Sequence, residues 1–306
     1  MAKINNEAPR VFLVGDNPFH GISHLSQERA RSRSGTGDSP LDKSDVVLSS
    51  LRSGANGFMF SVSDTTLSIL RVLRERKSVD GLKLYAIVPY AFEYVRVATQ
   101  TGTPGLAKKV LKQIAVSGNV KAFLKGSKAV FKMDPSGLLD TYLSYEISRI
   151  KSAVGSKKNL ASALLHEVVT DMGLALDMEW LFSSYIASLS KIGIVPGFHT
   201  RNFPYLVKKF NQWNMDADHI IITTPFNKAG FQMNPSREEC EKTLANLTSP
   251  IVLAISILAG GYFQPSAAVD YIAGLDNLKG VVAGVSTEQQ ARETFELFTE
   301  RLREGC

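Results

Sequence analysis

Cysteine and long apolar runs are both scarce in this chain. Its two cysteines, Cys240 and Cys306, are too few for a disulfide framework or a thiolate metal site. No run approaches the ~18 uncharged apolar residues that a membrane-spanning helix needs. The opening residues, MAKINNEAPR, lack the apolar stretch of a secretory signal. We therefore expect a soluble, cytoplasmic protein with no membrane partner.

Acidic residues are absent from one long stretch of the chain. Residues 94–133 hold eight basic side chains and no acidic one: Arg96, Lys108, Lys109, Lys112, Lys121, Lys125, Lys128 and Lys132. Since the whole chain has a net charge of +6, its basic excess is confined to this stretch. No aromatic pattern of a nucleic-acid-binding protein accompanies it, so we interpret it as a solvated helical face and expect no nucleic-acid partner. A phosphate, an acidic protein or a membrane surface is the alternative partner.

Short apolar runs rich in β-forming residues alternate with helical patterns along the whole chain. Eight such runs are present: 11–15, 57–63, 82–90, 159–167, 193–199, 219–227, 250–261 and 280–286. Each is followed by apolar residues at helical spacing, as in SREECEKTLANL from Ser236. Eight repeated βα units predict an α/β fold of the (β/α)8 TIM-barrel class.

Two connections in this predicted barrel are long. The first βα loop, from about Asp16 to Leu41, holds the polar segment DNPFHGISH. The second contains a helical insertion, residues 91–133, after the third strand, and DPSGLLDTYLSYEISRI then resumes the barrel helix. We expect residues 1–306 to form one domain, with both connections at the C-terminal end of the barrel, where such folds bind ligands. At the last helix, Ser286 is predicted as the capping residue with Gln289 reaching back.

Polar residues follow nearly every predicted strand. In a barrel they would form one ring: Asp16, Asn17, His20, Asp64, Tyr90, His166, Glu167, His199, Arg201, Asn227, Lys228, Gly260, Gly261, Gly284 and Ser286. Four of the five histidines fall at or near this face, and only His219 begins a strand. Because histidine titrates nearest neutral pH, His166 beside Glu167, or His199 near Arg201, could act as a general acid or base. Each could equally be a structural, hydrogen-bonded group.

Two other chemistries fit parts of this ring. Nitrogen and oxygen ligands for a metal could come from His20, His166 and His199 with Asp16, Asp64 or Glu167, but the close histidine spacing of a strong metal motif is missing, so no metal site is predicted. An anion could bind Arg29, Arg31 and Arg33 of the first loop. It could also bind the backbone amides where GVSTEQQ opens the last helix, a common phosphate site in barrels.

The chain from Asn159 to its end resembles the aldo/keto reductase superfamily. The similar segments are ALLHE, TPFNKAGF, LAISILAGGYFQPSAAVDYI and GVVAGVSTEQQARETFELF. The resemblance implies hydride transfer from NADPH, with a His, an Asp, a Tyr and a Lys in the reaction. It also implies that the cofactor is held by residues after strands five to eight: Arg201, Asn227, Gly260, Gly261, Gly284, Ser286, Thr287 and Gln289.

Two of the four catalytic positions match the family. His166 fits the histidine and Asp64 the aspartate, but Ser68 and Ile69 stand where the tyrosine is expected. Val88 and Pro89 stand where the lysine should project, and Gln290 and Thr294 replace groups that hold the adenine-ribose phosphate. Tyr90 could supply the missing phenol from a neighbouring strand.

The leading interpretation is an enzyme acting on a small polar carbonyl or hydroxyl compound, with or without a phosphate, and using NADP if the reaction is redox. The first alternative is a non-redox lyase, isomerase or hydrolase in which His166, Glu167, His199 and Asp16 serve as acid–base groups or metal ligands. The second is a non-catalytic barrel that binds a partner through its basic insertion. The substrate and the oligomeric state are left open by the sequence.

Overall fold

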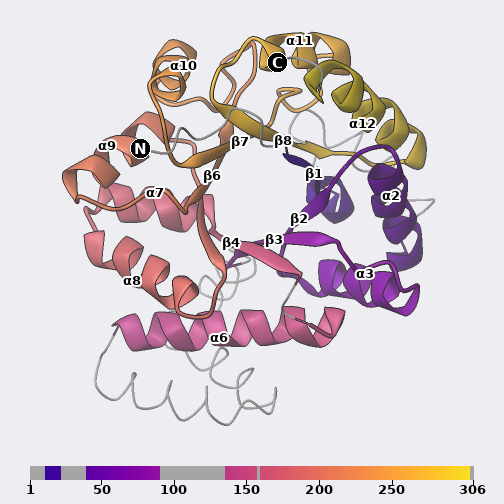
Figure 1. Ribbon diagram of the computed structural model, residues 1–306, viewed down its shortest axis with the longest axis horizontal. Helices are drawn as coiled ribbons and strands as arrows, with labels where there is room; N and C mark the ends of the chain where they lie inside the picture. The colour runs from indigo at the N-terminus through magenta and orange to yellow at the C-terminus, as the bar shows by residue number, and fades with distance from the viewer. Residues whose placement is uncertain (1–10, 22–38, 90–134, 157–158, 304–306) are drawn as a thin grey trace.

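A closed barrel of eight parallel strands forms the centre of the protein (Figure 1). The computed structural model describes residues 11–21, 39–89, 135–156 and 159–303. The strands are β1 (Val11–Gly15), β2 (Gly57–Ser61), β3 (Lys83–Val88), β4 (Leu160–Leu165), β5 (Val195–His199), β6 (Ile221–Pro225), β7 (Ile251–Ile255) and β8 (Leu278–Gly284). Each lies within or overlaps one predicted run, and their order around the barrel follows the sequence. The predicted (β/α)8 class is confirmed.

Helices surround the barrel on its outer side (Figure 1). They are α2 (Pro40–Arg52), α3 (Asp64–Glu75), α6 (Pro135–Val154), α7 (Glu167–Ala175), α8 (Glu179–Ser190), α9 (Phe203–Gln212), α10 (Arg237–Ala245), α11 (Pro265–Ala273) and α12 (Glu288–Arg303). Both α7 and α8 lie between β4 and β5. The predicted insertion, residues 91–133, lies outside the described residues. None of the helices in the described ranges is long and apolar enough to cross a membrane.

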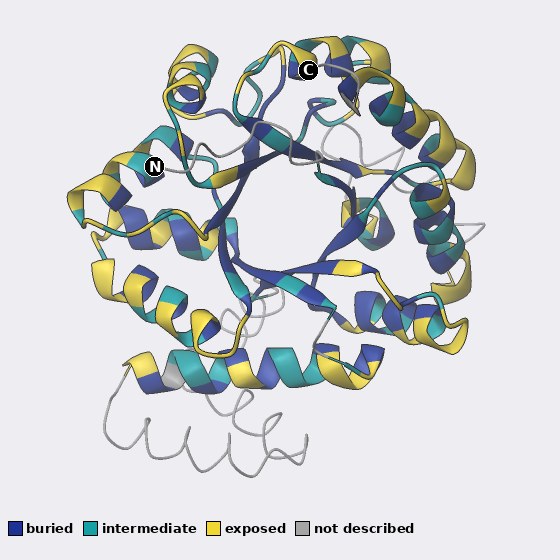
Figure 2. Ribbon diagram, in the orientation of Figure 1, coloured by how far each residue is buried: buried dark blue, intermediate teal, exposed yellow. Residues whose placement is uncertain are grey.

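The strands separate two apolar layers, because successive side chains point to opposite faces. The barrel interior is filled by Leu13, Met59, Tyr85, Ile87, Leu164, Ile221, Leu253 and Val282. The alternate residues, among them Phe12, Phe58, Phe198 and Ile222, pack against the helices in the larger outer core. Figure 2 shows the buried strands and the exposed outer faces of the helices. The barrel is therefore a packed core, and polar chemistry is confined to the strand ends and to a few inward polar side chains.

The start of the first connection, residues 16–21, packs against the barrel rim. A short 3-10 helix, η1 (Asn17–His20), follows β1 directly. Gly15 and Gly284 are neighbours across the β1–β8 pair, and a Cβ atom on Gly284 would lie 2.9 Å from Cδ of Pro18. The glycine lets η1 pack against the end of β8, which fixes the position of Asp16 and His20.

The cap of α12 differs from its prediction by one residue. The hydroxyl of Thr287 accepts the N–H of Gln290 at 3.2 Å, and Oε1 of Gln290 accepts the N–H of Ser286 at 3.0 Å. The predicted Ser286–Gln289 capping box was therefore wrong, because the helix begins at Glu288 and its reciprocal partner is Gln290. The side chain of Gln289 instead bonds Glu293 at 2.8 Å.

Candidate active site at the carboxyl end of the barrel

Two histidines lie close together at the carboxyl ends of β4 and β5. His166 directly follows β4 and His199 is the last residue of β5, and the strand register sets Leu165 beside Phe198. The two imidazole ring centres are 6.2 Å apart. Both residues were predicted from their place after a strand, and the structure brings them together.

Glu167 and Arg201 form an ion pair beside these histidines. Nε of Arg201 donates to Oε2 of Glu167 at 3.0 Å, and Nη2 donates to Oε1 at 2.5 Å. The same Oε2 atom lies 3.3 Å from Nε2 of His199. Such a two-point guanidinium–carboxylate contact fixes both groups in direction as well as in distance. Glu167 is therefore held against His199 by Arg201.

A second set of hydrogen bonds fixes the loop after β5 to α7. Asp171, one turn beyond Glu167, accepts the Thr200 hydroxyl at 2.5 Å and the Arg201 N–H at 3.3 Å. Thr200 in turn accepts the N–H of Asn202 at 2.9 Å. Because the backbone of Arg201 is anchored in this way, its side chain has a defined origin from which to reach Glu167.

The charges of this cluster follow from burial and from one another. Burial alone would raise the pKa of Glu167, but His199 and Arg201 outweigh it, so the pKa lies below its usual value and the group is a carboxylate at neutral pH. Burial lowers the pKa of His199 to about 4, against the opposing charge of Glu167. His199 is therefore neutral at pH 7. Neither of its buried ring nitrogens makes a hydrogen bond of good geometry in the described part of the chain, and Nε2 has only the 3.3 Å contact with Glu167.

His166 is also held in its neutral form, with a defined tautomer. Burial lowers its pKa, while the charges of Glu167 and Asp16 act in the opposite direction and that of Arg201 in the same direction. Its Nδ1 atom accepts the backbone N–H of Val168 at 3.2 Å, because His166 caps the start of α7. An accepting Nδ1 carries no proton, so the proton of the neutral ring is on Nε2.

Asp16 and His20 form a carboxylate–imidazole pair on the neighbouring sector of the rim. Oδ2 of Asp16 lies 3.0 Å from Nε2 of His20 and accepts the backbone N–H of Ser61 at 2.7 Å. Both side chains are more than nine-tenths buried. The bond to Ser61 connects the end of β1 to the end of β2, so Asp16 is oriented by the barrel and by η1.

Two buried hydroxyl groups were missed by sequence reasoning. Oγ of Ser162 on β4 and Oγ1 of Thr223 on β6 are buried and make no hydrogen bond within the described residues. Thr223 is the register partner of His199. Threonine is a common strand residue and gave no sign of function inside the apolar run HIIITTPFN.

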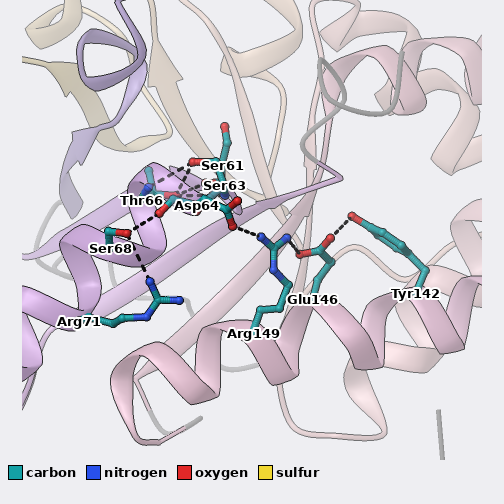
Figure 3. A network of polar contacts seen from close by, with 9 residues as sticks. All are labelled: Ser61, Ser63, Asp64, Thr66, Ser68, Arg71, Tyr142, Glu146 and Arg149. Atoms are coloured by element: carbon teal, nitrogen blue, oxygen red, sulfur yellow. Dashed lines mark hydrogen bonds and ion pairs between the residues drawn. The ribbon is translucent and has the colours of Figure 1, made fainter. Parts of the chain in front are cut away.

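Asp64 points toward Arg149 of α6, as Figure 3 shows. Its side chain is 97% exposed and accepts a hydrogen bond at 2.9 Å from Arg149 of α6. Arg149 also donates to the buried Glu146 at 3.1 Å, and Glu146 accepts the hydroxyl of Tyr142 at 2.9 Å. These contacts join the start of α3 to α6, so the role of Asp64 in them is to hold two helices together.

The residues predicted to hold a cofactor are dispersed along the rim, and several are already bonded. The Asn227 side chain donates to the carbonyl of Phe231 at 2.9 Å and accepts its N–H at 2.8 Å, which closes the loop after β6. Gly260 and Gly261 have φ values of 74° and 98° in the turn after β7. Tyr90 lies outside the described residues. Within the described ranges, no group of three or more His, Cys, Asp and Glu side chains is arranged to hold a metal ion.

Comparison with known proteins finds similarity only among solved structures. No family model and no curated protein matches the chain. Two structures from Pseudomonas aeruginosa, each described as a "putative aldo-keto reductase", match at TM-scores of 0.57 and 0.59, with 10% identity. The matches cover 97% and 98% of this chain and 92% and 95% of those chains. A "putative isomerase" from Sinorhizobium meliloti matches at a TM-score of 0.44, with 9% identity over 94% of this chain and 54% of that one, too low to bear on function.

The likeness is one of fold. At this identity the two Pseudomonas structures show that the chain shares their barrel fold over nearly its full length. Function rests on the side chains of this chain itself.

Proposed function

We propose that the protein is an enzyme in which His166 polarises a small polar carbonyl or hydroxyl compound and donates a proton to its oxygen, while the Asp16–His20 pair exchanges a proton with the same compound. One observation carries the proposal. The N–H of Val168 occupies Nδ1 of His166, so the neutral imidazole has its proton on Nε2. A neutral N–H donor polarises a carbonyl oxygen and can pass a proton to it as negative charge develops.

The neighbouring groups have roles that follow from their contacts. Glu167 is an ionised group already paired with Arg201, so its role is to support the charge balance of the histidines rather than to remove a proton. Asp16 and His20 form the carboxylate–imidazole pair available to exchange a proton with substrate. The charge of Asp16 also opposes the fall in the pKa of His166, which joins the two sectors electrostatically.

Hydride transfer with NADP is the second candidate, favoured by the fold likeness to the two Pseudomonas structures. The described residues do not fit the cofactor well. Of those expected to hold it, Arg201 is paired with Glu167, Asn227 is bonded to Phe231, and the N–H of Ser286 is taken by Gln290. We therefore base no step of the chemistry on NADP.

Proton exchange with solvent tests the proposal on a panel of simple carbonyl compounds. The protein is incubated in D2O with glyceraldehyde, dihydroxyacetone and their phosphates, and deuterium incorporation next to the carbonyl is followed by NMR. Exchange above the protein-free rate supports the proposal, and His166→Gln should slow it by about 100-fold or more. The exposed His219 provides a matched control, since His219→Gln should exchange at the wild-type rate.

Two other outcomes contradict the proposal. Oxidation of NADPH in the presence of these carbonyl compounds, with no deuterium incorporation in its absence, would establish the reductase candidate instead. Exchange that is equally fast in the wild type and His166→Gln would exclude His166 as the proton donor.

A further inference from the structure

The barrel interior contains a pair of polar side chains whose hydrogen-bonding capacity is not satisfied within the described residues. His199 and Thr223 are adjacent in the register of β5 and β6. The residues before them, Phe198 and Ile222, pack outward into the helix-facing core, so alternation turns His199 and Thr223 toward the interior. Oγ1 of Thr223 and Nδ1 of His199 are buried and make no hydrogen bond within the described residues, and Nε2 of His199 has only its ion-pair contact with Glu167 at 3.3 Å.

Unbonded buried polar atoms are unusual in native proteins. A buried hydroxyl or imidazole nitrogen without a partner has lost its hydrogen bond to water and gained none in the protein, which destabilises the fold. Here two adjacent side chains on neighbouring strands are both in this state, at the end of the barrel where β4 also delivers His166. One polar group of a ligand that enters from the mouth of the barrel could form hydrogen bonds with both side chains.

The layer below this pair is closed. A Cβ atom on Gly197, one inward position earlier on β5, would lie 2.9 Å from Cγ of Leu164 and 3.0 Å from both Oγ of Ser162 and the carbonyl of Ile221. Side chains therefore fill the interior immediately beneath His199 and Thr223. A group that reaches them stops there, beside the ring of His166.

We infer that His199 and Thr223 form a subsite that binds one hydroxyl or carbonyl oxygen of the substrate, next to the oxygen that His166 polarises. This inference rests on the proposed function and names two residues that would contact substrate. The Thr223 hydroxyl can donate to or accept from a substrate oxygen. Nε2 of the neutral His199 ring faces the Glu167 carboxylate, which leaves Nδ1 to accept from a substrate hydroxyl. Two adjacent oxygen sites select a compound with oxygen atoms on neighbouring carbons, such as a hydroxyaldehyde or hydroxyketone.

Isosteric replacement separates this role from a structural one. Thr223→Val keeps the side-chain volume and removes the hydroxyl. Because that hydroxyl has no partner in the free protein, the variant should melt at the same temperature or higher. Thr223→Ser keeps the hydroxyl and should bind as the wild type does.

Ser162→Ala is the matched control. Ser162 also has an unbonded buried hydroxyl, but it lies in the filled layer beneath the subsite, beside Gly197. A ligand that stops at His199 and Thr223 does not enter that layer, so Ser162→Ala should leave ligand binding unchanged.

Binding is measured by NMR titration of the histidine side-chain signals with glyceraldehyde, dihydroxyacetone and their phosphates. The inference predicts that a ligand which shifts His166 also shifts His199, and that Thr223→Val weakens its binding about five- to tenfold. A ligand that shifts His166 but binds Thr223→Val as tightly as the wild type would overturn the subsite alone. A loss of several degrees in melting temperature in Thr223→Val would also overturn it, since the hydroxyl would then have a partner in the free protein. If no compound shifts either histidine, the proposed function itself fails.

Discussion

Arg201 holds Glu167 with two parallel hydrogen bonds, at 3.0 and 2.5 Å, and thereby sets Oε2 of Glu167 3.3 Å from Nε2 of His199. Two segments that are more than thirty residues apart in sequence, the start of α7 and the end of β5, are joined by this contact. The charge that faces His199 is therefore fixed by the geometry of an arginine.

Replacing Arg201 tests this relationship. Arg201→Lys keeps the charge but loses the two-point contact, so the free energy of unfolding should fall by about 1–2 kcal/mol in urea denaturation. Arg201→Gln also removes a positive charge that lowers the pKa of His199, so that pKa should rise. The exposed Arg301–Asp270 pair, at 3.3 Å, is the control: Arg301→Gln should cost no more than about 0.5 kcal/mol. Equal losses in the two variants would contradict the assigned role of Arg201.

The two rim histidines predict how stability depends on pH. Burial lowers the pKa of His199 to about 4 and lowers that of His166 as well, whereas both titrate near 6.5 in the unfolded chain. Between pH 6.5 and about 4 the unfolded state therefore binds more protons, and stability falls as the pH falls. His199 alone should contribute a loss of roughly 3 kcal/mol across this window.

Substitution of His199 identifies the source of this dependence. His199→Asn should show a shallower loss of stability between pH 6.5 and 4, measured by urea denaturation at each pH, even if its stability at pH 7 is lower. His219→Gln, at an exposed position, should follow the wild-type curve. Below about pH 4.5, protonation of Glu167, whose pKa is lowered in the folded protein, should add to the loss. A wild-type curve that is flat from pH 6.5 to 4 would contradict the buried, neutral histidines.

Asp16 should affect both the pKa of His166 and the stability of the protein. Asp16→Asn removes a charge that raises the pKa of His166, so NMR titration should find that pKa lower than in the wild type. The variant should also lose about 1–2 kcal/mol of stability, because the bond to the Ser61 N–H is then made by a neutral amide. His20→Asn disrupts the same pair but leaves the carboxylate, so it should not lower the pKa of His166 in this way. An unchanged His166 pKa in Asp16→Asn would contradict the electrostatic effect of Asp16 on His166.

Asp64 should be dispensable for activity. Its exposed side chain and its ion pair with Arg149 place it on the outer contact between α3 and α6. Asp64→Asn should therefore leave deuterium exchange within about twofold of wild type and cost less than about 1 kcal/mol in stability. A loss of activity comparable to that of His166→Gln would instead support the catalytic aspartate implied by the aldo/keto reductase resemblance.

The barrel could be predicted from the sequence because its signal is repeated. Eight apolar runs, each followed by a helical pattern, leave few other architectures, and small errors at the ends of elements do not change the result. The capping box at α12 shows where such reading fails. Ser286, Thr287, Gln289 and Gln290 allow two registers one residue apart, and only the helix start at Glu288 decides between them.

The site was predictable only in part, for physical reasons. His166 and His199 were found because they follow strands, and parallel strand ends converge in a barrel. Asp64 also follows a strand, but Ser63 caps α3 with Thr66, so Asp64 begins the helix and turns outward to Arg149. Thr223 looked like an ordinary strand residue, and its unbonded hydroxyl is visible only once its neighbours are known.

The protonation state of His166 tests the central claim most directly. Two-dimensional NMR of protein labelled with ¹⁵N-histidine distinguishes an imidazolium from each neutral tautomer. At pH 7 the account predicts a neutral His166 with its proton on Nε2 and a bare Nδ1 bonded to the N–H of Val168. An imidazolium at pH 7, or a neutral ring with its proton on Nδ1, would contradict the proposed role of His166 as the group that polarises the substrate.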